Sequence, residues 1–240
     1  MKSMDSMFDG CSGLTHIDVS SLDTSNATNM SWMFNGCEGL TALDLSGFIT
    51  SRVTDMCDMF RDCSGLKQLD VRSFNTGNVT DMCNMFRGCS SLKQLDMRYM
   101  DTGNVTDMCN MFRGCGSLVQ LDVSHFDTGN VTTMWNMFRD CSSLTHMDVS
   151  AFDTKNVTDM TGMFSGCSSL LSLKLCSLSS ENIRTDDMLR GCIKLKTIIT
   201  PPLLRAEIEL PTSFVDRNGT ETKYLRQEFC STTLTRKSTD

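Results

Sequence analysis

The sequence predicts an α/β solenoid, a curved stack of short repeats with a parallel β-sheet on its concave side, short helices on its convex side and a small β cap at its carboxyl end. Three observations support this prediction: a fixed period, a change within each repeat from strand-like to helix-like spacing, and a tail that breaks the pattern. The 26-residue period is marked by Cys11, Cys37, Cys63, Cys89, Cys115, Cys141 and Cys167, and Cys192 follows 25 residues later.

The first half of each repeat predicts a short strand. In the unit 63–89, Leu66, Leu69 and Val71 have the LxxLxL spacing of a leucine-rich repeat. Alternation along a strand turns Leu69 and Val71 into the core and Asp70 outward. Strands at the same phase of neighbouring repeats are expected to lie side by side as a parallel sheet.

The second half predicts a short helix over residues 80–88. Its apolar residues recur at i, i+3, i+4 and i+7, the spacing of the buried face of a helix. Thr80 is a suitable N-cap, Asp81 favours the positive end of the helix dipole, and Gly88 ends the helix. Because helices need more room than strands, we expect the stack to curve with the sheet inside. The apolar positions are Met82, Met85, Phe86 and Cys89.

The pattern divides the chain into two regions. Residues 1–200 form a solenoid of about seven units, the first of them partial, so we expect a fragment of a longer protein. In residues 201–240, the strand-like runs 208–215 and 220–225 flank an Asn-Gly turn signal. We interpret this region as a β-hairpin cap over the open end, with a loose, flexible tail over residues 235–240. A linker to a lost domain is the alternative.

The repeat sequence is also similar to that of a known family. The units LDVSHFDTGNVTTMWNMFRDCSSL and LDMRYMDTGNVTDMCNMFRGCGSL resemble the 26-residue repeat of BspA-like bacterial surface leucine-rich repeat proteins, over residues 4–198. The resemblance implies a curved leucine-rich solenoid on a secreted or cell-surface bacterial protein, often linked with adhesion to host or neighbouring cells. Arg52 in place of the corner Asn, Ile49 before Thr and Lys174 in place of Asp depart from the family pattern.

Composition and motifs argue against several function classes. The formal net charge of −7 opposes a nucleic-acid partner, because phosphate contacts need a basic face. No run approaches the roughly 20 apolar residues of a spanning helix, so we expect no membrane insertion. His16 and His146 are five units apart, roughly 24 Å at strand spacing, and no nucleophile elbow or phosphate loop occurs. We therefore predict no catalytic residue, no cofactor and no enzyme activity.

The 13 cysteines are expected to be free thiols. Those at the last apolar position of the predicted helix behave as small buried hydrophobes. Neighbouring helices would hold them about 8–10 Å apart, too far for a disulfide. A second row, Cys57, Cys83 and Cys109, is interpreted as packing between units. No CxxC and no Cys/His set has zinc spacing, so the sequence predicts no metal site.

Acidic residues recur at the outward position of the predicted strands, about 4.8 Å from one copy to the next. We expect these carboxylates to accept hydrogen bonds from neighbouring Ser, Thr or backbone donors. A cation site, with calcium as a candidate, or a cationic partner is the alternative. The Asn of the repeated NVT, such as Asn78, is expected to form corner hydrogen bonds. The acidic column is Asp18, Asp44, Asp70, Asp96, Asp122 and Asp148.

A binding surface is expected where the outward columns vary from unit to unit. The middle units combine charge, an aromatic ring and hydrogen-bond donors, residue types that often anchor interfaces. The alternative is drift on a solvated face. A second, lower-ranked surface is the row Arg61, Arg87, Arg113 and Arg139, which the predicted helix points to solvent. These arginines either pair with nearby Asp or cap carbonyls or receive an acidic glycan or protein. The candidate binding residues of the concave face are Gln68, Arg72, Gln94, Arg98, Tyr99, Gln120 and His125.

These observations favour a non-enzymatic, monomeric binding module that recognises a protein or glycan partner on host or neighbouring cells through its concave face. The resemblance implies that it acts at the cell surface or outside the cell. A rigid spacer that holds another domain is one alternative. A regulator or inhibitor solenoid in a reducing compartment is another, because such a compartment accepts many unpaired cysteines more easily.

Overall fold

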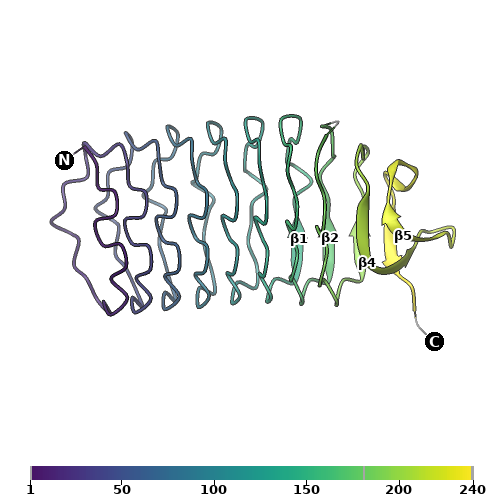
Figure 1. Cartoon of the computed structure of the whole chain (residues 1–240), viewed down its shortest axis with the longest axis horizontal. Coiled ribbons are helices and arrows are strands. Elements are labelled where there is room, and N and C mark those ends of the chain that lie inside the picture. Colours follow the sequence, from purple (N-terminus) through teal and green to yellow (C-terminus); the bar gives the residue numbers. More distant parts are fainter. Residues whose placement is uncertain (1, 181, 239–240) are drawn as a thin grey trace.

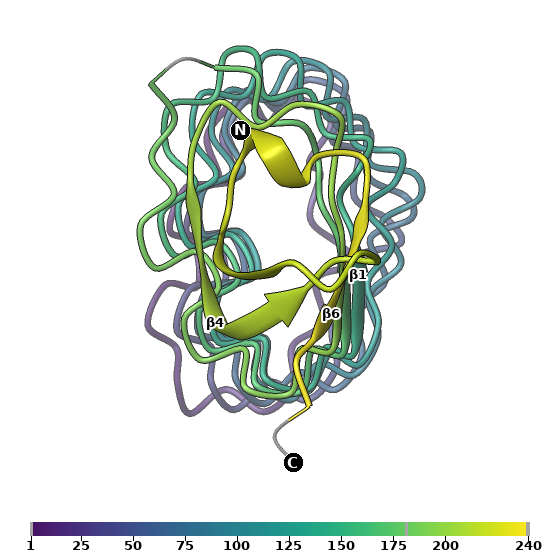
Figure 2. The ribbon, with the colours of Figure 1, turned by 90° about the vertical axis from the view of Figure 1, so that its right-hand side faces the viewer.

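The protein, described by a computed structural model over residues 2–180 and 182–238, is a stack of similar coils. Figure 1 shows the coils following one another in a nearly straight row from the amino to the carboxyl end. Seen along the row in Figure 2, each coil runs once around a common interior. No described helix is long and apolar enough to cross a membrane.

The parallel sheet expected along one side is present in the last coils. Strands β1 (His146–Asp148), β2 (Ser172–Lys174) and β3 (Thr197–Ile199) pair in parallel, with Met147 opposite Leu173 and Leu173 opposite Ile198. The same phase of earlier coils is not assigned to strands, as in residues 94–96. We call this side of the molecule, at the phase of β1 to β3, the sheet face.

The short helices expected on the other side are not present in the described residues, and this part of the fold prediction is wrong. Main-chain hydrogen bonds there span three residues, from the N–H of Met85 to the carbonyl of Met82 (3.2 Å) and from that of Arg87 to Asn84 (2.9 Å). These are the bonds of successive β-turns. Asn84 (φ 55°) and Gly88 (φ 74°) are left-handed, which a right-handed helix does not allow. The face made by residues 82–89 and their equivalents is the turn face.

The close spacing of the coils explains why turns replace helices. Alternate residues of the turn face donate to the next coil, as from Phe86 N–H to the carbonyl of Met111 (2.9 Å) and from Gly88 N–H to that of Arg113 (2.7 Å). Helices packed side by side need about 8–10 Å between their axes. Phenylalanine rings stacked in neighbouring coils lie only 5.4–5.8 Å apart. Because the expected curvature depended on bulky helices, its basis is removed together with them.

The residues predicted to face the core are buried even though the helix is absent. Met82, Met85, Phe86 and Cys89 have no exposed surface, and Leu69 is 7% exposed. The turns therefore direct the same apolar positions inward that a helix would have buried. Each core cysteine donates its S–H to the carbonyl of a phenylalanine in the preceding coil, at 3.0–3.2 Å; the donors are Cys37, Cys63, Cys89, Cys115, Cys141, Cys167 and Cys192.

Polar ladders join the coils at their corners. The Asn78 side chain donates to the carbonyl of Ser51 (2.8 Å), which confirms the corner role expected for the NVT asparagine. The buried Thr76 hydroxyl donates to the carbonyl of Asp101 in the following coil (2.8 Å). Thr80, expected as an N-cap, instead donates to the carbonyl of Thr54 (3.2 Å). Each coil is thus tied to both neighbours by side chains as well as by backbone.

The end of the stack is covered by a small antiparallel sheet (Figure 2). Strand β4 (Ile208–Val215) pairs with β5 (Glu221–Leu225), and β6 (Thr233–Arg236) lies between β3 and β4. The 3-10 helix η1 (Gln227–Phe229) precedes β6. The expected loose tail is wrong over residues 235–236, which belong to β6 and pair with β3 and β4. Residues 239–240 of that tail lie outside the described part of the chain.

Candidate functional site

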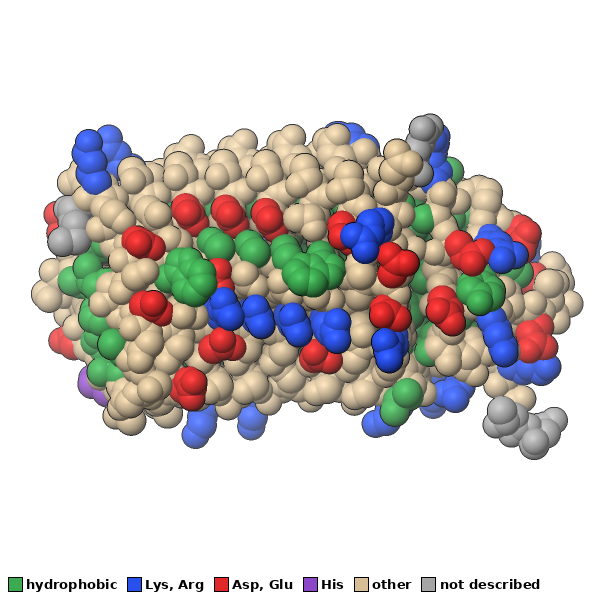
Figure 3. Space-filling model, viewed as in Figure 1, with side chains coloured by type: hydrophobic (Ala, Val, Ile, Leu, Met, Phe, Trp, Pro, Cys, Tyr) green, Lys and Arg blue, Asp and Glu red, His purple; other side chains and the backbone are tan. Residues whose placement is uncertain are grey.

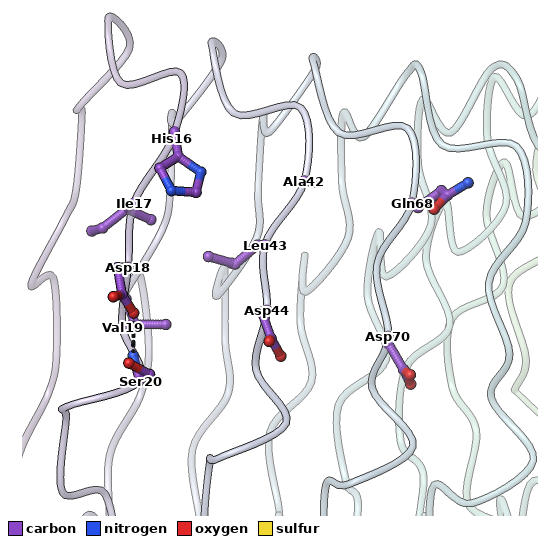
Figure 4. A pocket seen from close by; sticks show the side chains of 10 residues that line it. All are labelled: His16, Ile17, Asp18, Val19, Ser20, Ala42, Leu43, Asp44, Gln68 and Asp70. Carbon is purple, nitrogen blue, oxygen red and sulfur yellow. Dashed lines mark hydrogen bonds between the residues drawn. The ribbon is translucent and has the colours of Figure 1, made fainter.

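Of the seven residues predicted for the binding surface, Gln68, Gln94 and Gln120 lie at the strand phase of the sheet face, and they do not form one site with the others. Those others lie in the turn that follows the strand phase: Arg72, Arg98, Tyr99 and His125. Arg72 and Tyr99 line one hollow, whereas Gln94 and Gln120 line a second hollow of about 720 Å³. Gln68 lines a third hollow near the amino end, beside His16 and the first carboxylates of the acidic column (Figure 4). The predicted surface is therefore a series of depressions, of which the one near the amino end and the one at Arg72 share Asp44 and Asp70 in their linings.

Two of the predicted residues are held in place by carboxylates of their own coil. The Arg72 guanidinium contacts Asp70 with Nη2 at 2.6 Å and Nε at 3.0 Å, and Arg98 contacts Asp96 in the same manner at 2.8 and 3.0 Å. The hydrogen bonds from the guanidinium, followed by the backbone N–H of the same arginine, lower the pKa of Asp70 to about 2; the same bonds from Arg98 lower the pKa of Asp96 to about 2. Each pair is thus a fixed, neutral unit.

The acidic column has the role expected of it, although the bonds run within each coil. Each carboxylate accepts the backbone N–H two residues later at 2.9–3.2 Å. Such local bonds stabilise the turn that leaves the strand position. These bonds place the side chain of the donor residue beside the carboxylate. In two middle coils the donor residue is an arginine, and in the others it is a serine. The coils therefore share a backbone motif and differ in the side chain presented.

The hollow between Arg72 and Tyr99 combines an aromatic ring with charged and hydroxyl side chains. It has a volume of about 390 Å³ and is lined by Asp44, Ser46, Asp70, Arg72, Ser73 and Tyr99. The Tyr99 side chain is 61% exposed, and the Arg98 guanidinium lies over its ring at 6.0 Å from the centroid. One aromatic surface therefore borders carboxylate, guanidinium and hydroxyl groups in adjacent coils. We call this depression the Tyr99 hollow.

His125 has different contacts from the other predicted residues. Its ring packs edge-on against Phe126, with centroids 5.0 Å apart. It lines neither the Tyr99 hollow nor the hollow of Gln94 and Gln120. Its side chain is exposed, so its contribution to recognition depends on a ligand that extends beyond these depressions.

The turn face carries the second predicted surface, the arginine row, visible as a line of blue side chains in Figure 3. The sequence predicted that these side chains point to solvent, with pairing to nearby Asp as one possibility, and the structure holds all four half-buried. Arg61 is paired with Asp58 and Asp62, each at 3.2 Å. Burial, followed by the charges of the neighbouring arginines, lowers the pKa of Arg113. The row is thus a packed ladder rather than a set of extended cations.

The turn face also holds the second cysteine row. Cys57, Cys83 and Cys109 are half-buried, and contact first with the Cys109 side chain and then with that of Cys57 lowers the pKa of Cys83. The contact with Cys83, followed by burial, raises the pKa of the other two thiols. The 13 cysteines are free, but the reason given for this was wrong, because the coils are closer than 8–10 Å.

One group of side chains that sequence reasoning missed lies in this row. Cys83, Asp107 and Cys109 present two sulfurs and a carboxylate oxygen within 4.8 Å of one another. Ligand spacings typical of zinc sites are short, whereas these two cysteines are 26 residues apart. The repeated Asp-x-Cys in units one period apart was the signal that could have indicated the group.

Comparison with known proteins gives a family and some distant structures. The family model described as "Mycoplasma protein of unknown function, DUF285" matches residues 2–100 and 92–200. No curated protein matches the chain. The matching description does not name BspA-like proteins, so that similarity stays a resemblance.

Two solved structures are similar to parts of this chain. A leucine-rich repeat protein from Bacteroides ovatus has 22% identity over 72% of this chain, with a TM-score of 0.43. This chain covers 41% of that protein. A leucine rich cell surface protein from Faecalibacterium prausnitzii has 17% identity, with 81% of this chain and 68% of that chain covered, at a TM-score of 0.27.

Proposed function

The chain belongs to the DUF285 family of Mycoplasma proteins of unknown function, and from that premise we propose that it is a non-enzymatic binding module that recognises a glycan on its sheet face. The observation that carries the proposal is the Tyr99 hollow. There an exposed aromatic ring borders a fixed carboxylate–guanidinium pair. In line with the resemblance to surface repeat proteins, the proposed place of action is the cell surface or its exterior.

The chemistry of the Tyr99 hollow suits a sugar. The apolar face of a pyranose ring can stack on Tyr99, whose phenol also offers a polar tip. Sugar hydroxyls donate to carboxylates and accept from guanidinium groups, and both are present in the pair of Asp70 and Arg72. Because these two groups already hold each other, a ligand meets them with little ordering of side chains left to be done.

A glycan fits these observations better than a protein partner. A stable protein interface buries about 800 Å² on each side and has an apolar centre. The large exposed apolar side chains on this side, Tyr99, Val119 and Ile199, lie in different coils. With Asp44 beside the paired Asp70 and Arg72, the Tyr99 hollow carries one excess negative charge, which disfavours an acidic ligand, so a neutral glycan is the ligand class we expect.

The test is binding of the purified chain to an array of neutral and acidic glycans, beside immobilised extracellular-matrix proteins. Tyr99→Ser should weaken glycan binding by about 10-fold or more, the loss expected when one stacked ring is removed. Tyr224→Ser is the matched control, because Tyr224 is also exposed and lies under an arginine, Arg226, but belongs to the cap. Circular dichroism should show that all three proteins are folded.

Three outcomes would overturn the proposal. Binding confined to the proteins would point to protein recognition, and equal glycan binding by the Tyr99→Ser and Tyr224→Ser variants would remove the Tyr99 hollow from the site. Absence of binding by the folded parent would favour a rigid spacer. The near-straight, continuously hydrogen-bonded stack is a property that suits such a spacer.

A further inference from the structure

Three metal-binding side chains converge on the turn face, on the side of the stack away from the Tyr99 hollow. The sulfurs of Cys83 and Cys109 and a carboxylate oxygen of Asp107 lie within 4.8 Å of one another. The two cysteines hold the same position in adjacent coils, and Asp107 lies two residues before Cys109. All three residues are half-buried, so the group is partly shielded and still reachable from solvent.

The backbone fixes the position of these residues. Met82 N–H donates to the carbonyl of Asp107 (3.2 Å), and Asn84 N–H donates to that of Cys109 (2.8 Å). These bonds lie on either side of Cys83 and set the register of the two coils. A ligand set held by main-chain bonds needs little ordering when it binds an ion.

Hydrogen-bond donors point at the same atoms that would bind the ion. Cys109 N–H donates to Oδ1 of Asp107 (2.7 Å), which orients the carboxylate and leaves Oδ2 for another contact. The side-chain amide of Asn84 donates to Sγ of Cys83 (3.1 Å), and that of Asn110 to Sγ of Cys109 (3.0 Å). Asn110 is 4% exposed, so its amide is well shielded from water. Outer donors of this kind orient metal ligands.

The equivalent positions of the neighbouring coils have different residues or different contacts. On one side, Thr133 and Trp135 stand where Asp107 and Cys109 stand, and this pair offers no carboxylate and no thiol. On the other side, the Cys57 thiol donates to Oδ2 of Asp58 (2.9 Å). The group of Cys83, Asp107 and Cys109 is therefore a local feature of this chain and not a property of every repeat.

We propose that Cys83, Cys109 and Asp107 bind a zinc-type divalent cation between the two coils. Zinc accepts sulfur at roughly 2.3 Å and carboxylate oxygen at roughly 2.0–2.2 Å, so two bound sulfurs lie roughly 3.8 Å apart in a tetrahedral site. Side-chain rotation within a group already this close suffices to reach that geometry. Each thiol releases its proton to solvent on binding, and a solvent molecule takes the fourth position.

The experiment titrates Co²⁺ alone into the reduced, chelator-treated chain without oxygen, and then displaces it with Zn²⁺. We expect one Co²⁺ per chain, a thiolate-to-cobalt charge-transfer band, the visible bands of tetrahedral cobalt, and loss of all three on addition of Zn²⁺. Zinc should also raise the Tm of the parent, because an ion that binds only the folded state stabilises it. The absence of a thiolate band in the folded parent would overturn the proposal.

Variants identify the ligands. Cys83→Ser and Cys109→Ser should abolish the charge-transfer band. Asp107→Asn, which can still accept the Cys109 N–H, should weaken Co²⁺ binding by about 10-fold or more, since loss of an outer partner alone costs about that much. Cys230→Ser, at a half-buried thiol in the cap, should bind like the parent. Equal binding by Asp107→Asn and the parent, or by Cys83→Ser and the parent, would contradict the assignment.

Discussion

At the scale of single residues, each core cysteine donates a hydrogen bond to a phenylalanine carbonyl of the preceding coil. The Cys115 thiol donates to the carbonyl of Phe86 at 3.1 Å, and burial raises the pKa of this thiol well above its usual range. A small apolar side chain with one weak donor meets both demands of the site. Cysteine is thus repeated here for packing and hydrogen bonding. The partners of the second row, Cys57, Cys83 and Cys109, differ from coil to coil.

The carboxylate–guanidinium pairs of the sheet face give a pH prediction. The pKa of Asp70 is about 2, below its ordinary 3.8, so the pair's contribution to stability is present above about pH 4 and is lost as the pH falls through about 2. In Arg72→Ser the pKa of Asp70 should rise toward 3.8 but stay below it, as for Asp44, whose pKa is lowered by Ser46. Carboxyl-carbon NMR titration measures this shift.

Asp96 is the internal control for that titration. Its partner Arg98 is intact in the variant, and the charge of Arg72 is the smallest of the effects that act on its pKa, so this pKa should rise only slightly from about 2. An Asp70 that titrates near 3.8 in the parent, or that does not respond to Arg72→Ser, would show that the pair does not form in solution.

At the scale of the element, the unit of the turn face is a run of linked turns with left-handed residues four positions apart. Asn84 and Gly88 take these positions in one coil, and Asn110 and Gly114 take them in the next. Asparagine and glycine tolerate this conformation better than other residues. The element therefore depends on a few backbone angles and on bonds to its neighbours, not on helix propensity.

Two glycines of this element allow backbone strain to be separated from crowding. In Gly114→Ala the new Cβ would meet only ordinary contacts at 3.6 Å, so the free energy of unfolding should fall by the roughly 1–2 kcal/mol cost of a left-handed alanine. In Gly88→Ala, Cβ would clash with Oδ1 of Asp62 and lie 3.2 Å from its Cα, so the loss should be larger. Urea denaturation compares the two.

Gly13→Ala is the control for both substitutions, because no atom lies within 4 Å of the Cβ that it would add and the φ of Gly13 is not left-handed. It should change the free energy of unfolding by less than about 0.5 kcal/mol. A cost of Gly88→Ala equal to that of Gly114→Ala would mean that Asp62 moves aside freely.

At the scale of the whole molecule, each coil is stabilised by its neighbours, and the ends of the stack are its vulnerable places. At the carboxyl end, β6 covers the edge of β3, and Ile208, Phe214 and Leu234 of the cap have no exposed surface. The cap therefore closes a sheet edge and completes the core in one element. Open edges of this kind pair readily with other chains.

Removal of residues 203–240 should therefore make the protein self-associate. The truncation exposes the edge of β3 and the buried Leu195 and Ile198 of the last coil. Size-exclusion chromatography with light scattering should show oligomers that grow with concentration, whereas the full chain should stay a monomer. A monomeric, folded truncated chain would show that the last coil needs no cover.

Much of the architecture follows from the sequence because it depends on local alternation and period. The 26-residue repeat and the inward positions of Leu69 and Val71 required only the two-residue periodicity of a strand. The buried positions of Met82, Met85 and Phe86 were also correct, since linked turns and a helix can bury the same apolar spacing. The spacing of one chain segment therefore identified the core without identifying its conformation.

The conformation of the turn face and the grouping of its side chains depend on contacts between coils. The turns replace helices because hydrogen bonds between coils hold the chain at a spacing that excludes helices, and this spacing belongs to the stack, not to one repeat. For the same reason, Cys83 and Cys109 come together only when the coils are in register. Apolar spacing along the chain therefore sets which residues face the core, and the stacking of the coils sets their conformation and which surface groups meet.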